Sequence, residues 1–193
     1  MQPKKFKTVH RSHEPADAHS MNFTCFKNQK FLKSDRVCLW FVDALREALD
    51  KRQCALWAFC IMPDHAHLLV FPKAPTFDGS GFLFDLKKPV TDMAVEWVKA
   101  NDPSFLPRMQ DVQPNGKRYN RLWQRGGGYD RNIQTSEIIH VEIDYIHANP
   151  EKAGLVDKAT DWRWSSARQW QGLEGGLTLC DWTDLPPRPL QHH

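Results

Sequence analysis

Two histidines one residue apart are the side chains of this sequence best placed to do chemistry. His65 and His67 stand in the apolar run Ile61-Met62-Pro63-Asp64-His65-Ala66-His67-Leu68-Leu69-Val70. Successive residues of a β-strand point to opposite faces, so both imidazoles are expected on one face of a strand. Neighbouring imidazoles are typical of a metal site, although strand histidine pairs that bind no metal are at least as common. The pair therefore needs partners from elsewhere in the chain.

The partners that we expect are Tyr145 and Asn149. They belong to the segment Ile143-Asp144-Tyr145-Ile146-His147-Ala148-Asn149-Pro150, which has the pattern of a helix end. Residues four apart lie on the same helical face. Two imidazoles and an amide oxygen would leave positions open for Mg²⁺ or Mn²⁺ and for a phosphate oxygen. We predict one site in which His65, His67 and Asn149 are metal ligands and Tyr145 is the nucleophile that attacks a phosphodiester.

A tyrosine nucleophile suits the breaking and rejoining of DNA strands better than hydrolysis. The phosphodiester to a phenol keeps the energy of the broken bond, so a 3′-hydroxyl can later displace the phenolate without ATP. The sequence has three tyrosines, and Tyr145 is the one that falls on a predicted helix with an amide one turn away. Tyr119 and Tyr129 lie in a basic stretch and are assigned to base stacking instead.

That basic stretch, residues 117–131, carries five basic residues and one acid, Asp130, in a chain whose net charge is only +3. Alternating cations and aromatic rings are typical of single-stranded nucleic-acid binding, because cations meet phosphates and rings stack on bases. The side chains expected to bind DNA are Lys117, Arg118, Tyr119, Arg121, Trp123, Arg125, Tyr129 and Arg131. The stretch alone leaves open a solvated face with two core aromatics. Its three consecutive glycines indicate either a hairpin turn or a loop that another segment approaches closely.

Length and composition favour a single soluble globular domain. The chain has 193 residues, 41% of them hydrophobic and 25% charged. Its five cysteines form no C-x-x-C pair, and an odd number of them fits reduced, buried thiols. No apolar stretch of about 18 residues occurs, and no apolar region follows the charged N-terminus. We therefore expect a cytoplasmic protein without membrane contact, nucleoid-associated when bound to DNA.

The chain divides into three parts on composition. Residues 1–18 are expected to form a flexible basic arm, on which His10 and His13 would be solvated. Residues 19–171 would form a single catalytic domain, and residues 172–193 a glycine- and proline-rich tail.

Periodicity within the domain predicts a sheet with helices packed on it. Residues 21–26 and 55–61 have strand character, and Ser34 or Asp35 would cap a helix that continues to Leu49. Pro63 belongs to the connection between the 55–61 strand and the histidine strand, which makes a hairpin. Because the histidine strand is apolar on both flanks, we expect it in the middle of an antiparallel sheet.

Prolines guide the remaining predictions. Residues 82–100 are expected to be helical, with Pro89 interrupting the helix or marking its first turn, and residues 101–116 to form an irregular loop. A helix from Thr135 or Ser136 would end at Ala148 or Asn149, because the residue before Pro150 avoids the α region. Its face with Ile139, Ile143 and Ile146 would pack on the sheet, and Trp162 and Trp164 would pin the C-terminal segment to the body.

Four segments in matching order resemble the REP-associated tyrosine transposases, which are relatives of the single-tyrosine HUH transposases of the IS200-like superfamily. They are Met62-Pro63-Asp64-His65-Ala66-His67-Leu68-Leu69, Leu122-Trp123-Gln124-Arg125, Tyr145-Ile146-His147-Ala148-Asn149-Pro150-Glu151-Lys152-Ala153-Gly154-Leu155-Val156, and Trp164-Ser165-Ser166.

The resemblance implies an α+β fold of the ferredoxin-like (RRM-like) kind, with the histidine pair on a middle strand of an antiparallel sheet and the tyrosine on a facing helix. It also implies metal-dependent cleavage and joining of single-stranded DNA through a 5′-phosphotyrosine, with hairpin-forming REP-like repeats as substrate. By motif, His65 and His67 match the ligand pair, Tyr145 the nucleophile and Asn149 the third ligand. Asp64 stands where the family more often has Asn and could add an acid near the metal.

Two other functions remain as hypotheses. A hairpin or single-stranded DNA-binding protein without cleavage activity would use residues 117–131 and ignore metal. A metal hydrolase would use His65 and His67 alone, but the sequence lacks the further Asp and His that such enzymes usually place close downstream, and this function gives Tyr145 no task. The chain could act as a monomer or a homodimer.

Overall fold

The computed structural model describes residues 17–126 and 128–190. The arm predicted for residues 1–18, with His10 and His13, therefore lies almost wholly outside the described residues. Within them, the main sheet has four antiparallel strands in the order β2-β3-β1-β6. These strands are β1 (Ala18–Thr24), β2 (Cys54–Ile61), β3 (His65–Pro72) and β6 (Tyr129–Ile133).

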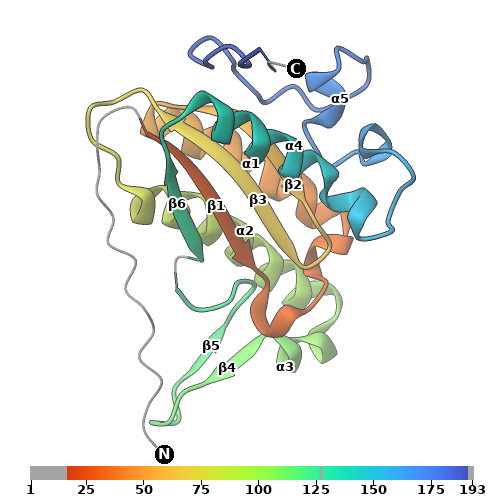
Figure 1. Cartoon of the computed structure of the whole chain (residues 1–193). Coiled ribbons are helices and arrows are strands. Elements are labelled where there is room, and N and C mark those ends of the chain that lie inside the picture. The colour runs from red at the N-terminus through yellow and green to blue at the C-terminus, as the bar shows by residue number, and fades with distance from the viewer. Residues whose placement is uncertain (1–16, 127, 191–193) are drawn as a thin grey trace, which may run out of the picture.

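Three long helices cover the two faces of this sheet (Figure 1). They are α1 (Asp35–Arg52), α2 (Gly79–Asn101) and α4 (Ser136–Lys152), and the shorter helices are α3 (Leu106–Met109) and α5 (Ala167–Trp170). The sequence β1-α1-β2-β3-α2-β6 with this strand order is the ferredoxin-like arrangement. The predicted α+β fold, with the histidine strand in the middle of an antiparallel sheet, is confirmed.

Alternate residues of β3 point to opposite faces of the sheet and pack in two different cores. Ala66, Leu68 and Val70 belong to the core shared with α1 and α2, whereas Leu69 belongs to the core under α4. His65 and His67 have the parity of Leu69, so their side chains lie on the α4 face. Helix α4 is held there by Ile139, Ile143 and Ile146, which are buried as predicted. Full burial of such a side chain contributes about 1.5–3 kcal/mol, which fixes the helix over the sheet.

The two helix prolines do not act as predicted. Pro89 lies inside α2, and Pro150 lies in the last turn of α4, which runs on to Lys152. A proline removes one backbone donor and crowds the carbonyl four residues before it. For Pro150 that carbonyl belongs to Ile146, and the Asn149 amide nitrogen lies 3.5 Å from its oxygen. Packing of the helices on the sheet outweighs the local preference.

Residues 101–116 are more regular than predicted. They contain a 3-10 turn, α3 and the strand β4 (Gln110–Val112), which pairs with β5 (Arg118–Asn120) in a hairpin separate from the main sheet. The prediction of an irregular loop is wrong because these strands are too short to show an alternation in sequence. Asp111 fixes the hairpin by binding Arg121 and Arg125.

The glycine stretch is not the turn of a hairpin, because β5 pairs with β4 and β6 pairs with β1. The other interpretation, a close approach of two segments, is confirmed at Gly128. Its φ is +82°, and a Cβ added there would lie 2.3 Å from the carbonyl oxygen of Asn22.

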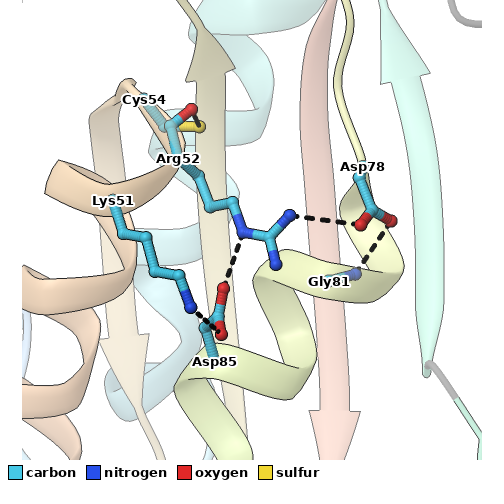
Figure 2. Close-up of polar contacts among 6 residues, drawn as sticks. All are labelled: Lys51, Arg52, Cys54, Asp78, Gly81 and Asp85. Atoms are coloured by element: carbon cyan, nitrogen blue, oxygen red, sulfur yellow. Dashed lines mark hydrogen bonds and ion pairs between the residues drawn. The ribbon is translucent and has the colours of Figure 1, made fainter.

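The end of α1 is tied to the start of α2 by a polar cluster (Figure 2). Arg52 donates to Asp85 at 2.6 Å and to Asp78 at 3.1 Å, and Asp78 caps α2 through the amide of Gly81. Partly exposed ion pairs contribute little stability, typically about 0–1 kcal/mol each. Their effect here is to set the position of α2 relative to α1.

The C-terminal segment packs on the outer edge of β2. The Trp162 indole donates to the Ile61 carbonyl at 3.0 Å, the Trp182 indole donates to the Trp57 carbonyl at 2.8 Å, and Trp164 is buried, so the expected pinning by Trp162 and Trp164 is present. No helix among the described residues is both long enough and apolar enough to cross a membrane.

Candidate active site

His65 and His67 lie side by side at the start of β3. Their ring centroids are 4.8 Å apart and their planes are inclined by 79°. His65 is partly exposed, whereas His67 is only 4% exposed because Cys60 and Asn22 flank it on the neighbouring strands. The pair thus has one imidazole at the surface and one beneath it.

The buried position of His67 keeps its imidazole neutral. Burial, with a smaller effect of neighbouring His65, lowers the pKa of His67 to about 4. Its Nε2 atom is buried and has no hydrogen-bond partner among the described residues. A neutral imidazole whose ring nitrogen has no other partner is what a metal ligand requires. The donor chemistry at this position therefore fits a divalent cation.

His65 is oriented by its neighbour in sequence. Asp64 Oδ1 lies 2.7 Å from His65 Nδ1. A carboxylate bound to one imidazole nitrogen fixes the ring and leaves the other nitrogen to face a ligand, as in many metal sites. Asp64, expected from the sequence to add an acid to the site, thus contacts His65 and holds its ring in position.

Helix α4 brings Tyr145 to the histidines. The Tyr145 and His67 ring centroids are 5.7 Å apart in an edge-on arrangement with an interplanar angle of 89°. The tyrosine is 43% exposed, so its side chain is accessible from solvent. Three of the four predicted site residues therefore come together, from segments about eighty residues apart in the sequence.

Lys152 is a further residue of this site that the sequence analysis missed. Its ammonium lies 5.0 Å from the centroid of the Tyr145 ring. It follows Tyr145 by seven residues, two helical turns, so helical spacing was the signal that could have identified it.

Asn149 lies one turn after Tyr145, as predicted, and its side chain binds the helix backbone. Its amide nitrogen donates to the Tyr145 carbonyl at 2.7 Å. Because the nitrogen is the atom engaged, Oδ1 is the amide atom that could ligate a cation. In the described residues no hydrogen bond joins Asn149 to either histidine.

Polar residues of β1 lie beside the two histidines on the same face of the sheet. Asn22 is the register partner of His67 on one side and of Tyr129 on the other, and Thr24 is the partner of His65. Both are partly exposed. The alternation of residues 21–26 was the signal that placed Asn22 and Thr24 on one face, although not beside the histidines.

The predicted DNA-binding side chains separate into groups. Exposed Lys117, Arg118 and Tyr119 lie in the β4–β5 hairpin, and exposed Tyr129 and Arg131 lie on β6. Arg131 donates to Glu142 of α4 at 2.8 Å. Arg121 and Arg125 share the carboxylate of Asp111, which leaves a net positive charge on this trio.

Trp123 does not belong with the DNA-binding residues. It is 5% exposed and packs edge-on against Phe23 at a centroid distance of 5.2 Å. Its ring faces are occupied by the core, so the assignment of Trp123 to base stacking is corrected. Arginine-flanked aromatics have the same pattern in sequence whether the ring points inward or outward.

His147 has a structural role. It is buried, its pKa is lowered to about 4 by burial, and its Nε2 lies 2.7 Å from the Ser166 hydroxyl. Ser166 also contacts the backbone of Phe59 on β2. The segment with Tyr145 and His147 and the segment Trp164-Ser165-Ser166 are thus joined by a buried hydrogen bond beneath α4.

Comparisons with known proteins find a similar sequence and a similar fold. No family model matches the chain. A Haemophilus influenzae protein named "Putative REP-associated tyrosine transposase" is 27% identical over 142 residues, which cover 68% of this chain and 73% of that protein. The solved structure of a REP-associated tyrosine transposase bound to a REP hairpin has the same fold, with a TM-score of 0.67 over 96% of this chain and all of that one, at 16% identity. Sequence and fold together confirm that this chain resembles the REP-associated tyrosine transposases.

Proposed function

We propose that this chain cleaves and rejoins single-stranded DNA next to hairpin-forming repeats through a 5′-phosphotyrosine. The observation that carries the proposal is the placement of the Tyr145 ring, edge-on to His67, whose Nε2 is buried without a partner. A nucleophile beside an unsatisfied, neutral imidazole has no evident structural purpose. It is the arrangement that transfer of a phosphoryl group to tyrosine requires.

The residues would divide the work as follows. His65, His67 and Asn149 would hold Mg²⁺ or Mn²⁺, which when bound supplies positive charge at the phosphate. The Tyr145 oxygen forms a bond to phosphorus as the bond to the 3′-oxygen breaks, and the phenol proton passes to solvent. The products are a 5′-phosphotyrosine and a free 3′-hydroxyl. In the reverse step a 3′-hydroxyl attacks the phosphorus and the tyrosine leaves.

The hairpin substrate is supported by two observations. The solved structure that shares this fold is of a transposase bound to a REP hairpin. The present chain exposes Lys117, Arg118 and Tyr119 on one hairpin and Tyr129 on β6, beside the candidate site. Such exposed cations and rings are able to contact phosphates and unstacked bases.

Covalent adduct formation tests the proposal. The chain is incubated with Mn²⁺ or Mg²⁺ and a hairpin oligonucleotide labelled at its 3′ end, because a 5′-phosphotyrosine keeps the fragment on that side. We expect a labelled protein band on a denaturing gel that disappears with Tyr145→Phe and with EDTA. Tyr119→Phe, at an exposed tyrosine outside the site, should leave it unchanged. Failure to form an adduct across hairpins of varied stem and flank would contradict the proposal.

A hairpin-binding protein without cleavage is the second candidate. Among residues 17–126 and 128–190, no group of three or more His, Cys, Asp or Glu side chains could hold a metal ion. A complete metal site thus depends on Asn149 joining the histidines. If it does not, binding would be salt-sensitive but indifferent to Mn²⁺ and to Tyr145→Phe.

A further inference from the structure

A polar hollow lies at the edge of β1, next to the candidate active site. Its volume is about 220 Å³, and Asn22, Thr24, Tyr129, Arg125 and Lys87 are among the residues that line it. A second hollow of about 490 Å³ runs between α2 and residues 120–126 and shares Lys87, Gln124, Arg125 and Gly126 with the first.

The hollow lies where the edge of β1 has no neighbouring strand, between the backbone contacts of Thr24 and Asn22. The Gln124 amide donates to the Thr24 carbonyl at 2.8 Å, and pairing with β1 resumes at Tyr129, opposite Asn22. Asn22 and Thr24 are also the register partners of His67 and His65. Adjacent strands are about 4.8 Å apart, so the outer edge of β1 lies within roughly 10 Å of the β3 backbone at the two histidines. Lys87 reaches this edge from the α1/α2 side of the sheet, over Phe23.

Lys87 of α2 places a cation in this hollow without an anion to balance it. Its ammonium lies 4.2 Å from the Phe23 ring centroid, and it makes no ion pair or side-chain hydrogen bond with any described residue. Burial lowers the pKa of Lys87 to about 8. Lys87 is half-buried, and a lysine partly removed from water usually has an anionic partner, because desolvation of an uncompensated charge is costly. The adjacent Lys88 is exposed and pairs with Asp92, as surface lysines commonly do.

Arg125 adds a second positive group to the lining of the hollow. Its guanidinium binds Asp111 through Nε at 2.8 Å and through Nη2 at 2.9 Å. Asp111 also binds Arg121, so one carboxylate serves two guanidinium groups. The hollow therefore has excess positive charge from two elements, and the ligand that it fits is an anion.

We propose that Lys87 and Arg125 bind a phosphate of the same single-stranded DNA whose scissile phosphate is presented to Tyr145, at the point where that strand passes the β1 edge from the α4 face towards α2. The identity of the ligand rests on the proposed function, whereas the anion site rests on the hollow itself. Lys87 would position the strand along the β1 edge, with Tyr129 beside it.

The test measures equilibrium binding of a fluorescent single-stranded oligonucleotide to the full chain in EDTA. Lys87→Gln should weaken binding about tenfold, the usual effect of losing one charge-assisted hydrogen bond. The slope of log affinity against log salt should fall by about 0.7, the value for one phosphate contact on a single strand. Lys88→Gln, one residue away, should change neither quantity.

A methylphosphonate scan locates the contact. Replacing each phosphate in turn with a neutral group should weaken binding additively with Lys87→Gln at all positions except the one that Lys87 touches. Full additivity at every position, or equal effects of Lys87→Gln and Lys88→Gln, would overturn the proposal. If Lys87→Gln proves unstable, Lys87→Met keeps the apolar stem over Phe23 and should lose the affinity that Lys87→Arg retains.

The outcome separates this inference from the proposed function. Lys87-dependent binding by a chain that forms no adduct would support the phosphate site and reject the chemistry. If the chain forms the adduct but Lys87→Gln binds the oligonucleotide as well as the wild-type chain does, the chemistry is supported and the phosphate site is rejected.

Discussion

At the scale of single residues, the two histidines proposed to bind the metal are held in different ways. Asp64 fixes the ring of His65 through a hydrogen bond, and burial keeps His67 neutral with an unpartnered Nε2. Residue types and spacing predicted the pair and its tyrosine. They could not predict that Trp123 is a core residue, because whether its ring points inward depends on Phe23 and the packing of the sheet.

Removing the Asp64 carboxylate should weaken metal binding without removing a ligand. Asp64→Ala frees the His65 ring, and loss of such a partner typically lowers metal affinity about 10- to 100-fold. Asp64→Asn retains an oxygen that accepts from Nδ1 and should stay near the wild-type value. The measurement is the Mn²⁺ concentration for half-maximal adduct formation with each variant. Identical values for Asp64→Ala and the wild-type chain would show that the contact does not orient the ligand.

At the scale of elements, regular periodicity was sufficient for the long helices and the histidine hairpin. It failed where tertiary contacts overrule local preference, as at Pro89 and Pro150, and where strands are as short as β4 and β5. The approach of α4 to β3 was foreseen from the apolar face of α4. The engagement of the Asn149 amide by the Tyr145 carbonyl was not, because it depends on the exact end of the helix.

The contact between Gly128 and Asn22 should be essential for the pairing of β6 with β1. Gly128→Ala would place a Cβ 2.3 Å from a backbone oxygen, whereas Gly126→Ala meets nothing within 4 Å. Both glycines have positive φ, so both substitutions carry a backbone strain of about 1–2 kcal/mol. Gly128→Ala should reduce the free energy of unfolding by about 2 kcal/mol more than Gly126→Ala. Urea denaturation measures both, and equal losses would show that the β1–β6 junction can relax around the new methyl group.

At the scale of the whole molecule, two positively charged surfaces among the described residues bear on the proposed DNA binding. One is the hollow with Lys87, at the edge of β1. The other is the β4–β5 hairpin, which extends from the body of the protein and carries Lys117 and Arg118 (Figure 1). Under the proposed function, a strand held at the first surface would be single, and the second surface would meet the stem of a hairpin.

This division predicts that the two surfaces respond differently to the form of the DNA. The double variant Lys117→Gln/Arg118→Gln should reduce the salt slope for hairpin DNA by about 1.8, the value for two duplex phosphate contacts, and leave binding of an unstructured oligonucleotide nearly unchanged. Arg46→Gln, which removes one exposed cation of α1 paired with Asp43, is the control for the general effect of losing a positive charge, and it should shift the slope for hairpin DNA by much less than half as much as the double variant. Equal losses on both DNA forms would mean that the hairpin does not distinguish stem from single strand.

The contacts along the outer edge of β2 have a consequence for how the chain is made. Backbone groups of Phe59, Ile61 and Leu56 pair with residues between 164 and 181 rather than with another strand. An open edge of such apolar composition would be a template for aggregation. Every residue of the candidate site has left the ribosome once Lys152 has emerged, but the β2 edge stays uncovered until Asp181 follows. For that interval of synthesis the nascent chain would carry a complete site and an unprotected sheet, which makes this the stage at which it most needs a chaperone.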